Sequence, residues 1–160
     1  MTNRDFFTKT WTDERSKFRK MLAATPWEQL EYRPHERSST AGQIAWQIVE
    51  EVRLLGESIH TGEMKWEPRP RPITLDELLT AFDGAADGLQ GYVEGVGEAG
   101  WDNPVKYYMN GQVFHTSNVQ DTAWGFLFDL IHHRGQLSSY IRPMGGKVPG
   151  IYGPSADDAG

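Results

Sequence analysis

The chain has no cysteine, and this absence excludes disulfide bonds, thiolate metal sites and a cysteine nucleophile. It also has no apolar run long enough to cross a membrane, and Met1 to Phe7 lacks the pattern of a secretory signal peptide. Acidic residues outnumber basic ones, which gives a formal net charge of −6. Because nucleic-acid binding needs a basic surface, we expect no nucleic-acid partner. The lack of a signal-peptide pattern and of a membrane-spanning run predicts a cytoplasmic protein without a membrane partner.

Apolar residues recur at helical spacing in four segments of the chain. The expected helices cover residues 3–24, 40–62, 74–96 and 117–142. The spacing of Ser or Thr and a later Gln or Glu predicts capping boxes that begin at Thr40, Thr74 and Ser117. Alternation between Val105 and Thr116, interrupted by Asn-Gly, predicts a β-hairpin. Because the four apolar stripes must cover one another, we expect an all-α fold, a four-helix bundle with a short β-hairpin between helices three and four.

The length of 160 residues fits one domain, 1–160, in which the Gly- and Pro-rich residues 143–160 form an extended C-terminal tail. Four glycines share one face of the third expected helix, opposite its apolar stripe: Gly84, Gly88, Gly91 and Gly95. A glycine inside a helix costs about 1 kcal/mol relative to alanine. The row therefore indicates either a weak, exposed surface or a close contact with another element or subunit.

Polar side chains lie in pairs on the flanks of two apolar stripes. Gln47 and Glu51 are four residues apart in the second expected helix, and Asp129 and His133 are four apart in the last. Residues with this spacing lie one turn apart on the same face, so each pair can reach a common atom. If the two helices are neighbours, the four side chains can converge around a metal ion. The alternatives are a buried His133–Asp129 hydrogen bond and a His133–Glu51 ion pair.

Two segments resemble the DinB-like family of damage-inducible four-helix-bundle proteins. They are Ser39 to Ile48, which resembles the second helix of that family, and Asp129 to Leu137, which contains His-His-Arg-Gly-Gln and resembles its last helix. The resemblance implies a bundle that binds one divalent metal ion, often nickel or zinc, through one histidine of helix two and two histidines of helix four. It also implies a homodimer, because some members are dimers.

On this resemblance, the implied metal ligands are Gln47, Asp129 and His133. His133 matches a family ligand, whereas Asp129 and Gln47 stand where the family has histidine. An aspartate retains an oxygen ligand, but a neutral amide is a weak ligand for zinc or nickel and suits manganese better. Glu51, one turn beyond Gln47, is an alternative ligand. The expected cofactor is therefore a divalent ion, either nickel, zinc or manganese.

Some relatives in this family transfer low-molecular-weight thiols. The resemblance therefore implies a metal-dependent thiol (S-)transferase acting on a small-molecule substrate. The thiol has to come from a separate molecule, since the chain has no cysteine. One alternative is a metal-dependent hydrolase. Another is a non-catalytic dimeric bundle with a degenerate metal site and a binding or stress-related role, which the residues at positions 47 and 129 favour.

Overall fold

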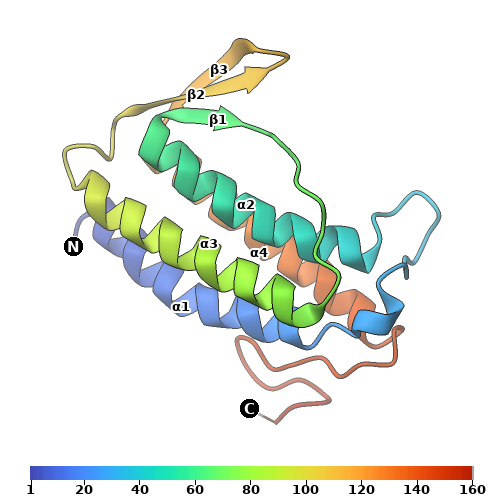
Figure 1. The fold of residues 1–160 in the computed structure, drawn as a ribbon. Helices are drawn as coiled ribbons and strands as arrows, with labels where there is room; N and C mark the ends of the chain where they lie inside the picture. Colours follow the sequence, from blue (N-terminus) through green and yellow to red (C-terminus); the bar gives the residue numbers. More distant parts are fainter. Residues whose placement is uncertain (160) are drawn as a thin grey trace.

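The computed structural model describes residues 1–159 and contains four long helices and three short strands (Figure 1). The helices are α1 (Asn3–Ala23), α2 (Ala41–Thr61), α3 (Leu75–Val96) and α4 (Val119–Ile141), and a short 3-10 helix covers Trp27–Gln29. The strands are β1 (Glu63–Lys65), β2 (Pro104–Met109) and β3 (Gln112–Asn118). The β2–β3 hairpin lies between α3 and α4 in the chain, as predicted. In space it lies at one end of the helices (Figure 1).

Side-chain caps fix where the helices begin. The predicted capping boxes at Thr40 and Thr74 are present, and Thr2 forms another at the start of α1. The predicted cap of the last helix is wrong by one residue, since the side chain of Asn118 accepts the hydrogen bond from the Asp121 backbone, at 2.7 Å. Ser117 and Asn118 both pair with β2, and the helix begins directly after Asn118, the last residue of β3.

The four helices and the hairpin are present as predicted, but the fold is not strictly all-α, because the hairpin belongs to a three-stranded sheet in the order β1-β2-β3. β2 and β3 pair antiparallel around Asn110 and Gly111, which have φ angles of 52° and 76°. β1 pairs parallel with β2. Gly62 ends α2 in the left-handed region, with φ 73°, and directs the chain alongside β2. A strand of only three residues is too short to show a periodicity, so the sequence did not reveal it.

The apolar faces of the four helices form one buried core. α2 packs against both α3 and α4, and the backbones of α2 and α3 come close together at Gly56. A Cβ atom at Gly56 would lie only 3.2 Å from the Cα atom of Leu89. Because α4 is the other neighbour of α2, the polar flanks of these two helices face each other.

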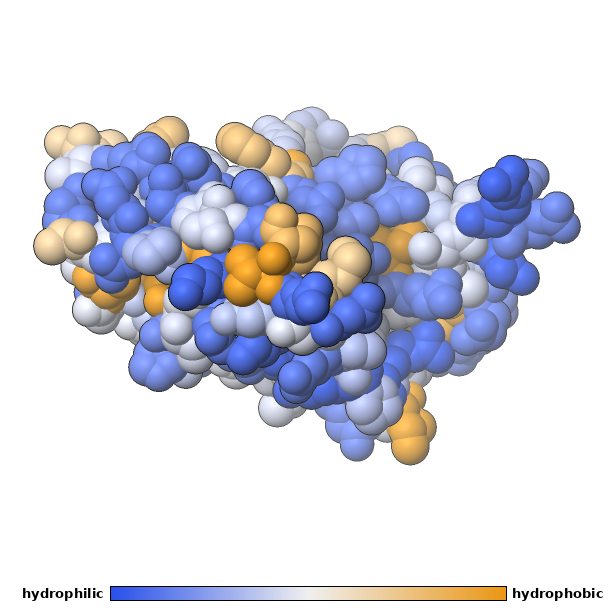
Figure 2. All heavy atoms as spheres, turned by 90° about the horizontal axis from the view of Figure 1, so that it is seen from above, coloured by the Kyte–Doolittle hydropathy of each residue, from blue (hydrophilic) through white to orange (hydrophobic). Residues whose placement is uncertain are grey.

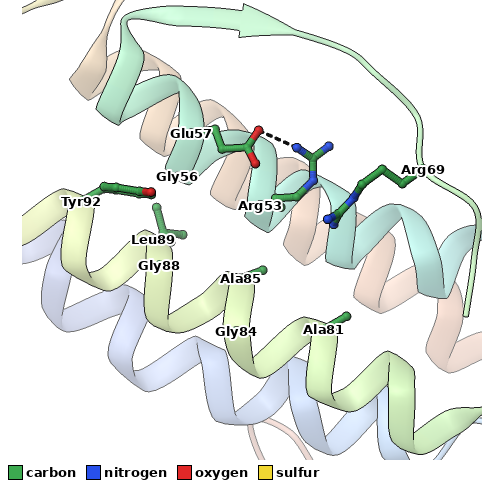
Figure 3. A pocket seen from close by; sticks show the side chains of 10 residues that line it. All are labelled: Arg53, Gly56, Glu57, Arg69, Ala81, Gly84, Ala85, Gly88, Leu89 and Tyr92. Carbon is green, nitrogen blue, oxygen red and sulfur yellow. Dashed lines mark hydrogen bonds and ion pairs between the residues drawn. The ribbon is translucent and has the colours of Figure 1, made fainter.

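The glycine row of α3 faces outward. Among the described residues, no atom lies within 4 Å of a Cβ built at Gly84, Gly91 or Gly95. Gly84 and Gly88 line a hollow of about 310 Å³ between α2 and α3, with Arg53 on its opposite side (Figure 3). Of the two interpretations of the glycine row, an exposed surface is therefore correct within the described chain, and a close contact with another element is not.

The tail after α4 folds back against α1 and α4 (Figure 1). Tyr152 of the tail donates a hydrogen bond to Glu14, which also forms a buried ion pair with Arg134 of α4. Burial opposes ionisation of Glu14, but hydrogen bonds from Lys17, Arg134 and Tyr152 outweigh it and lower the pKa of this carboxyl. Arg134 therefore has a structural role.

The surface on the hairpin side is mostly hydrophilic, and hydrophobic side chains lie on it in several small groups, one of them near the middle (Figure 2). Within residues 1–159, no helix combines the length and the apolar character that crossing a membrane requires.

Candidate metal centre

Four polar side chains from α2 and α4 meet at the boundary between these helices. The Nε2 atom of His133 lies 2.8 Å from Nε2 of Gln47, 3.4 Å from Oε1 of Glu51 and 3.6 Å from Oδ2 of Asp129. The potential ligand atoms of Glu51, Asp129 and His133 all lie within 4.8 Å of one another. The predicted convergence of the two flanks is therefore present, and Glu51 belongs to the cluster.

Glu51 is the most unusual member of this cluster. It is buried, and within the described part of the chain its Oε2 atom has no hydrogen-bond partner. Burial raises the pKa of the Glu51 carboxyl, as does Asp129 to a smaller extent, whereas Gln47 and His133 act in the opposite direction. Burying a carboxylate oxygen without a partner is costly. A cation between α2 and α4 would remove this cost, so the donor set fits a metal ion.

The amide of Gln47 links the two helices. It donates a hydrogen bond of 2.8 Å to Oε1 of Glu51 and faces Nε2 of His133 at the same distance. Nε2 of His133 is then the acceptor, and Nδ1 lies 3.4 Å from Oε1 of Gln136. For Gln47 to act as a ligand, as predicted, its amide has to turn over and present its oxygen. In the present arrangement Gln47 instead holds Glu51 and His133 in position.

The cluster is buried on one side and open on the other. The side chain of Asp129 is 57% exposed, compared with 14% for His133 and 5% for Glu51. A hollow of about 560 Å³ adjoins Asp129 and is lined by Tyr107, Asp121, Thr122, Gly125, Phe128 and His132. Nitrogen and oxygen donors suit zinc, nickel and manganese. An open side next to a hollow leaves room for a small molecule to approach.

Two further residues of this region, Gln136 and Tyr107, were not predicted from the sequence. Gln136, one turn beyond His133 on the same helix, orients the ring and was not predicted. The hollow also contains Tyr107, whose hydroxyl shares a hydrogen bond with Thr122 and which comes from the hairpin. The signal for Gln136 is its spacing of three from His133. Nothing in the spacing along the chain brings Tyr107 to this helix.

Comparison with known proteins identifies the family. A model of the DinB superfamily matches residues 10–137, which include both the Gln47–Glu51 and the Asp129–His133 pairs. The chain belongs to the DinB superfamily. It is 26% identical over 161 residues to the uncharacterised protein YrdA of Bacillus subtilis strain 168, and the match covers 96% of this chain and 90% of YrdA.

Two crystal structures of DinB-like proteins share the fold. One, from Bacillus cereus ATCC 10987, has a TM-score of 0.73 and 20% identity, and the match covers 91% of this chain and 95% of that one. The other, YjoA from Bacillus subtilis, has a TM-score of 0.67 and 16% identity, and the match covers 87% and 92% of the two chains. At these identities the likeness shows a common architecture, and the chemistry has to be argued from the side chains of this chain.

Proposed function

We propose that this DinB-superfamily protein binds one divalent metal ion between α2 and α4 and acts as a homodimeric, metal-dependent thiol transferase on a small molecule. Glu51, Asp129 and His133 would hold the ion. The observation that carries the proposal is the buried carboxyl of Glu51. Its Oε2 atom has no hydrogen-bond partner among the described residues, and its Oε1 atom lies 3.4 Å from the His133 imidazole, which also faces the Asp129 carboxylate. Gln47 would either supply a further oxygen or continue to position Glu51 and His133.

A bound divalent ion would lower the pKa of a thiol that reaches it and so favour the thiolate. The chain itself supplies position and access. Gln136 orients the His133 ring through a hydrogen bond at Nδ1. Glu51 is buried and accepts a hydrogen bond from Gln47. The hollow next to Asp129 gives a small molecule access from the open side. The thiol has to come from a separate molecule, because the chain has no cysteine.

A non-catalytic role is the second candidate, and the Gln47 amide favours it. This amide already connects Glu51 and His133 by hydrogen bonds, so the cluster can hold the two helices together without a metal ion. The two candidates differ in one measurable property. A cluster that only joins helices gains no stability when a divalent ion is added.

The test is thermal unfolding of metal-stripped protein with and without manganese, zinc or nickel. Because an ion that binds only the folded state stabilises it, a concentration of 100 times Kd should add about 2.7 kcal/mol. For a chain of this size we expect the melting temperature to rise by roughly 5–10 °C. His133→Ala should abolish the rise, whereas His35→Ala, in the loop before α2, should retain it.

Absence of any shift with all three ions would refute metal binding and favour the non-catalytic role. If metal binding is established, loss of free thiol in the presence of an electrophilic substrate tests transfer. We expect this reaction to depend on the metal and to fail in His133→Ala.

A further inference from the structure

The outward face of α4 carries a regular row of exposed residues. The row consists of Asp121, Gly125, Phe128, His132, Gly135 and Ser139, all exposed, with spacings of 4, 3, 4, 3 and 4. The opposite face of the helix contributes Leu127, Leu130 and Leu137 to the core. Alternating spacings of three and four are those of the contact seam between paired helices. This row is therefore shaped like a helix-pairing seam, yet no element of the described chain covers it.

The middle of the row combines an aromatic side chain with two hollows. Phe128 is 64% exposed, and its ring lies 5.9 Å from that of Trp124. Within the described residues, nothing lies within 4 Å of a Cβ built at Gly125 or Gly135. Gly125 lines the hollow beside Asp129, and Gly135 lines another of about 400 Å³ against the tail. Because glycine inside a helix costs about 1 kcal/mol, two of them beside an exposed phenylalanine favour a packing role.

The row has the same pattern when it is read in either direction. An antiparallel register that places Asp121 opposite Ser139 also places Gly125 opposite Gly135 and Phe128 opposite His132. A two-fold symmetric interface requires this property, since the same surface must complement itself. The exposed row is therefore suited to a second copy of the same chain.

The charges at the ends of the row agree with an antiparallel pair. Asp121 lies at its amino end, whereas at its carboxyl end, just past Ser139, the exposed Arg142 is paired with Asp157 of the tail at 2.8 Å. Parallel pairing would bring the two Asp121 carboxylates together, whereas antiparallel pairing keeps them apart. The helix dipoles likewise favour the antiparallel arrangement.

We propose that α4 pairs antiparallel with α4 of a second copy along this row. The proposal rests on the homodimer of the proposed function and names its surface and register. Phe128 of each chain then packs near Gly135 of the other. Because Asp129 follows Phe128, the partner subunit's His132 lies beside the open side of the candidate metal centre. The second copy thus narrows access to the hollow and completes the rim of the site.

The absence of native cysteine makes the register directly testable. In the double variant Asp121→Cys/Ser139→Cys, mild oxidation should link two chains, because the two positions are opposite each other across the pair. Each single variant should stay unlinked, since two copies of one position are 18 residues apart along the helices, about 27 Å. A disulfide needs Cα atoms within about 7 Å. Equal linking of the single and double variants, or no linking, would overturn the register.

A second experiment tests the surface by light scattering or sedimentation. Phe128→Glu should reduce the wild-type mass from two chains to one, whereas Ile73→Glu, at an 86% exposed apolar residue before α3, should leave two. Gly135→Gln should also give one chain with an unchanged or higher melting temperature. A wild-type monomer, or a dimer that survives Phe128→Glu, would overturn the inference. Metal titration of the Phe128→Glu monomer measures metal binding independently of the interface. A failure of metal binding is therefore distinguished from a failure of the interface.

Discussion

Replacing Glu51 with methionine should stabilise the metal-free protein, even though it removes a candidate metal ligand. The carboxyl is buried, and its Oε2 atom has no hydrogen-bond partner within the described residues. Methionine has a similar length and no group that requires a partner. The change therefore removes the cost of keeping this carboxylate in the bundle without leaving a large cavity.

The expected gain is modest but measurable. A buried polar atom without a partner costs about 1–3 kcal/mol, and the Gln47 amide loses an acceptor worth about 1 kcal/mol. The net stabilisation is the difference between these two terms, about 0–2 kcal/mol. For a domain of this size it raises the melting temperature by up to roughly 8 °C.

The pH dependence has a defined sign. Burial raises the pKa of Glu51 in the folded state, so the unfolded chain releases this proton at a lower pH than the folded protein does. Between the unfolded and folded pKa values the folded state binds more protons, and stability therefore falls as the pH rises. Glu51→Met should lack this contribution, so its advantage over the wild type should grow from pH 4 toward neutral pH.

The assay is thermal unfolding at several pH values in the presence of a chelator. Glu57→Met is the matched control, because it makes the same change on the same helix at a 48% exposed side chain and should change stability little. With excess metal the order should reverse, since only the wild type gains stability from binding. A Glu51→Met variant that is less stable than the wild type in chelator would refute the reasoning.

Two further predictions concern stability away from the candidate metal centre. Arg134→Met removes one hydrogen-bond donor from buried Glu14, which keeps Lys17 and Tyr152, and should cost about 1.5–3 kcal/mol in chemical denaturation. Because the folded pKa of Glu14 is lowered, the stability from its ionised form is present above the unfolded pKa, near 4.3, and should be lost as the pH falls through the folded value. In Arg134→Met this acid-dependent loss should be smaller, since only Lys17 and Tyr152 still lower the pKa. Gly91→Ala should raise stability by up to about 1 kcal/mol, because a Cβ there meets no described atom within 4 Å. Gly56→Ala should lower stability, because its Cβ would lie 3.2 Å from Leu89 of α3; equal effects of the two alanines would contradict this.

Local sequence signals were sufficient for most of the fold. Apolar spacing located the helices, and Asn110-Gly111 located the hairpin turn, because both depend on residues close together in the chain. β1 was missed because its pairing with β2 depends on a partner about 40 residues away. The cap of α4 was displaced by one residue because Ser117 and Asn118 are both suitable capping residues. Strand pairing extends through both residues, so the helix begins after the second of them.

The candidate site was predictable within each helix but not between helices. Spacing of four placed Gln47 with Glu51 and Asp129 with His133. The vertical register of α2 against α4 depends on how their apolar faces interlock, and this is set by tertiary packing. The structure brings Glu51 within 3.4 Å of His133, whereas spacing alone left its participation open. It also shows that Asp129 lies on the open side, which the sequence does not specify.

Glu51 offers a physical explanation for the glutamine at position 47. Both side chains leave the same face of α2 and reach the same imidazole, so a donor missing at 47 can be replaced from the next turn without moving either helix. The replacement changes the chemistry of the site, because carboxylate oxygen in place of imidazole nitrogen favours harder ions such as manganese. It also links metal binding to pH, since Glu51 must be ionised to act as a ligand and burial opposes its ionisation. Affinity for the ion should therefore decrease on acidification, and in Glu51→Met the part of this decrease that comes from Glu51 should be absent.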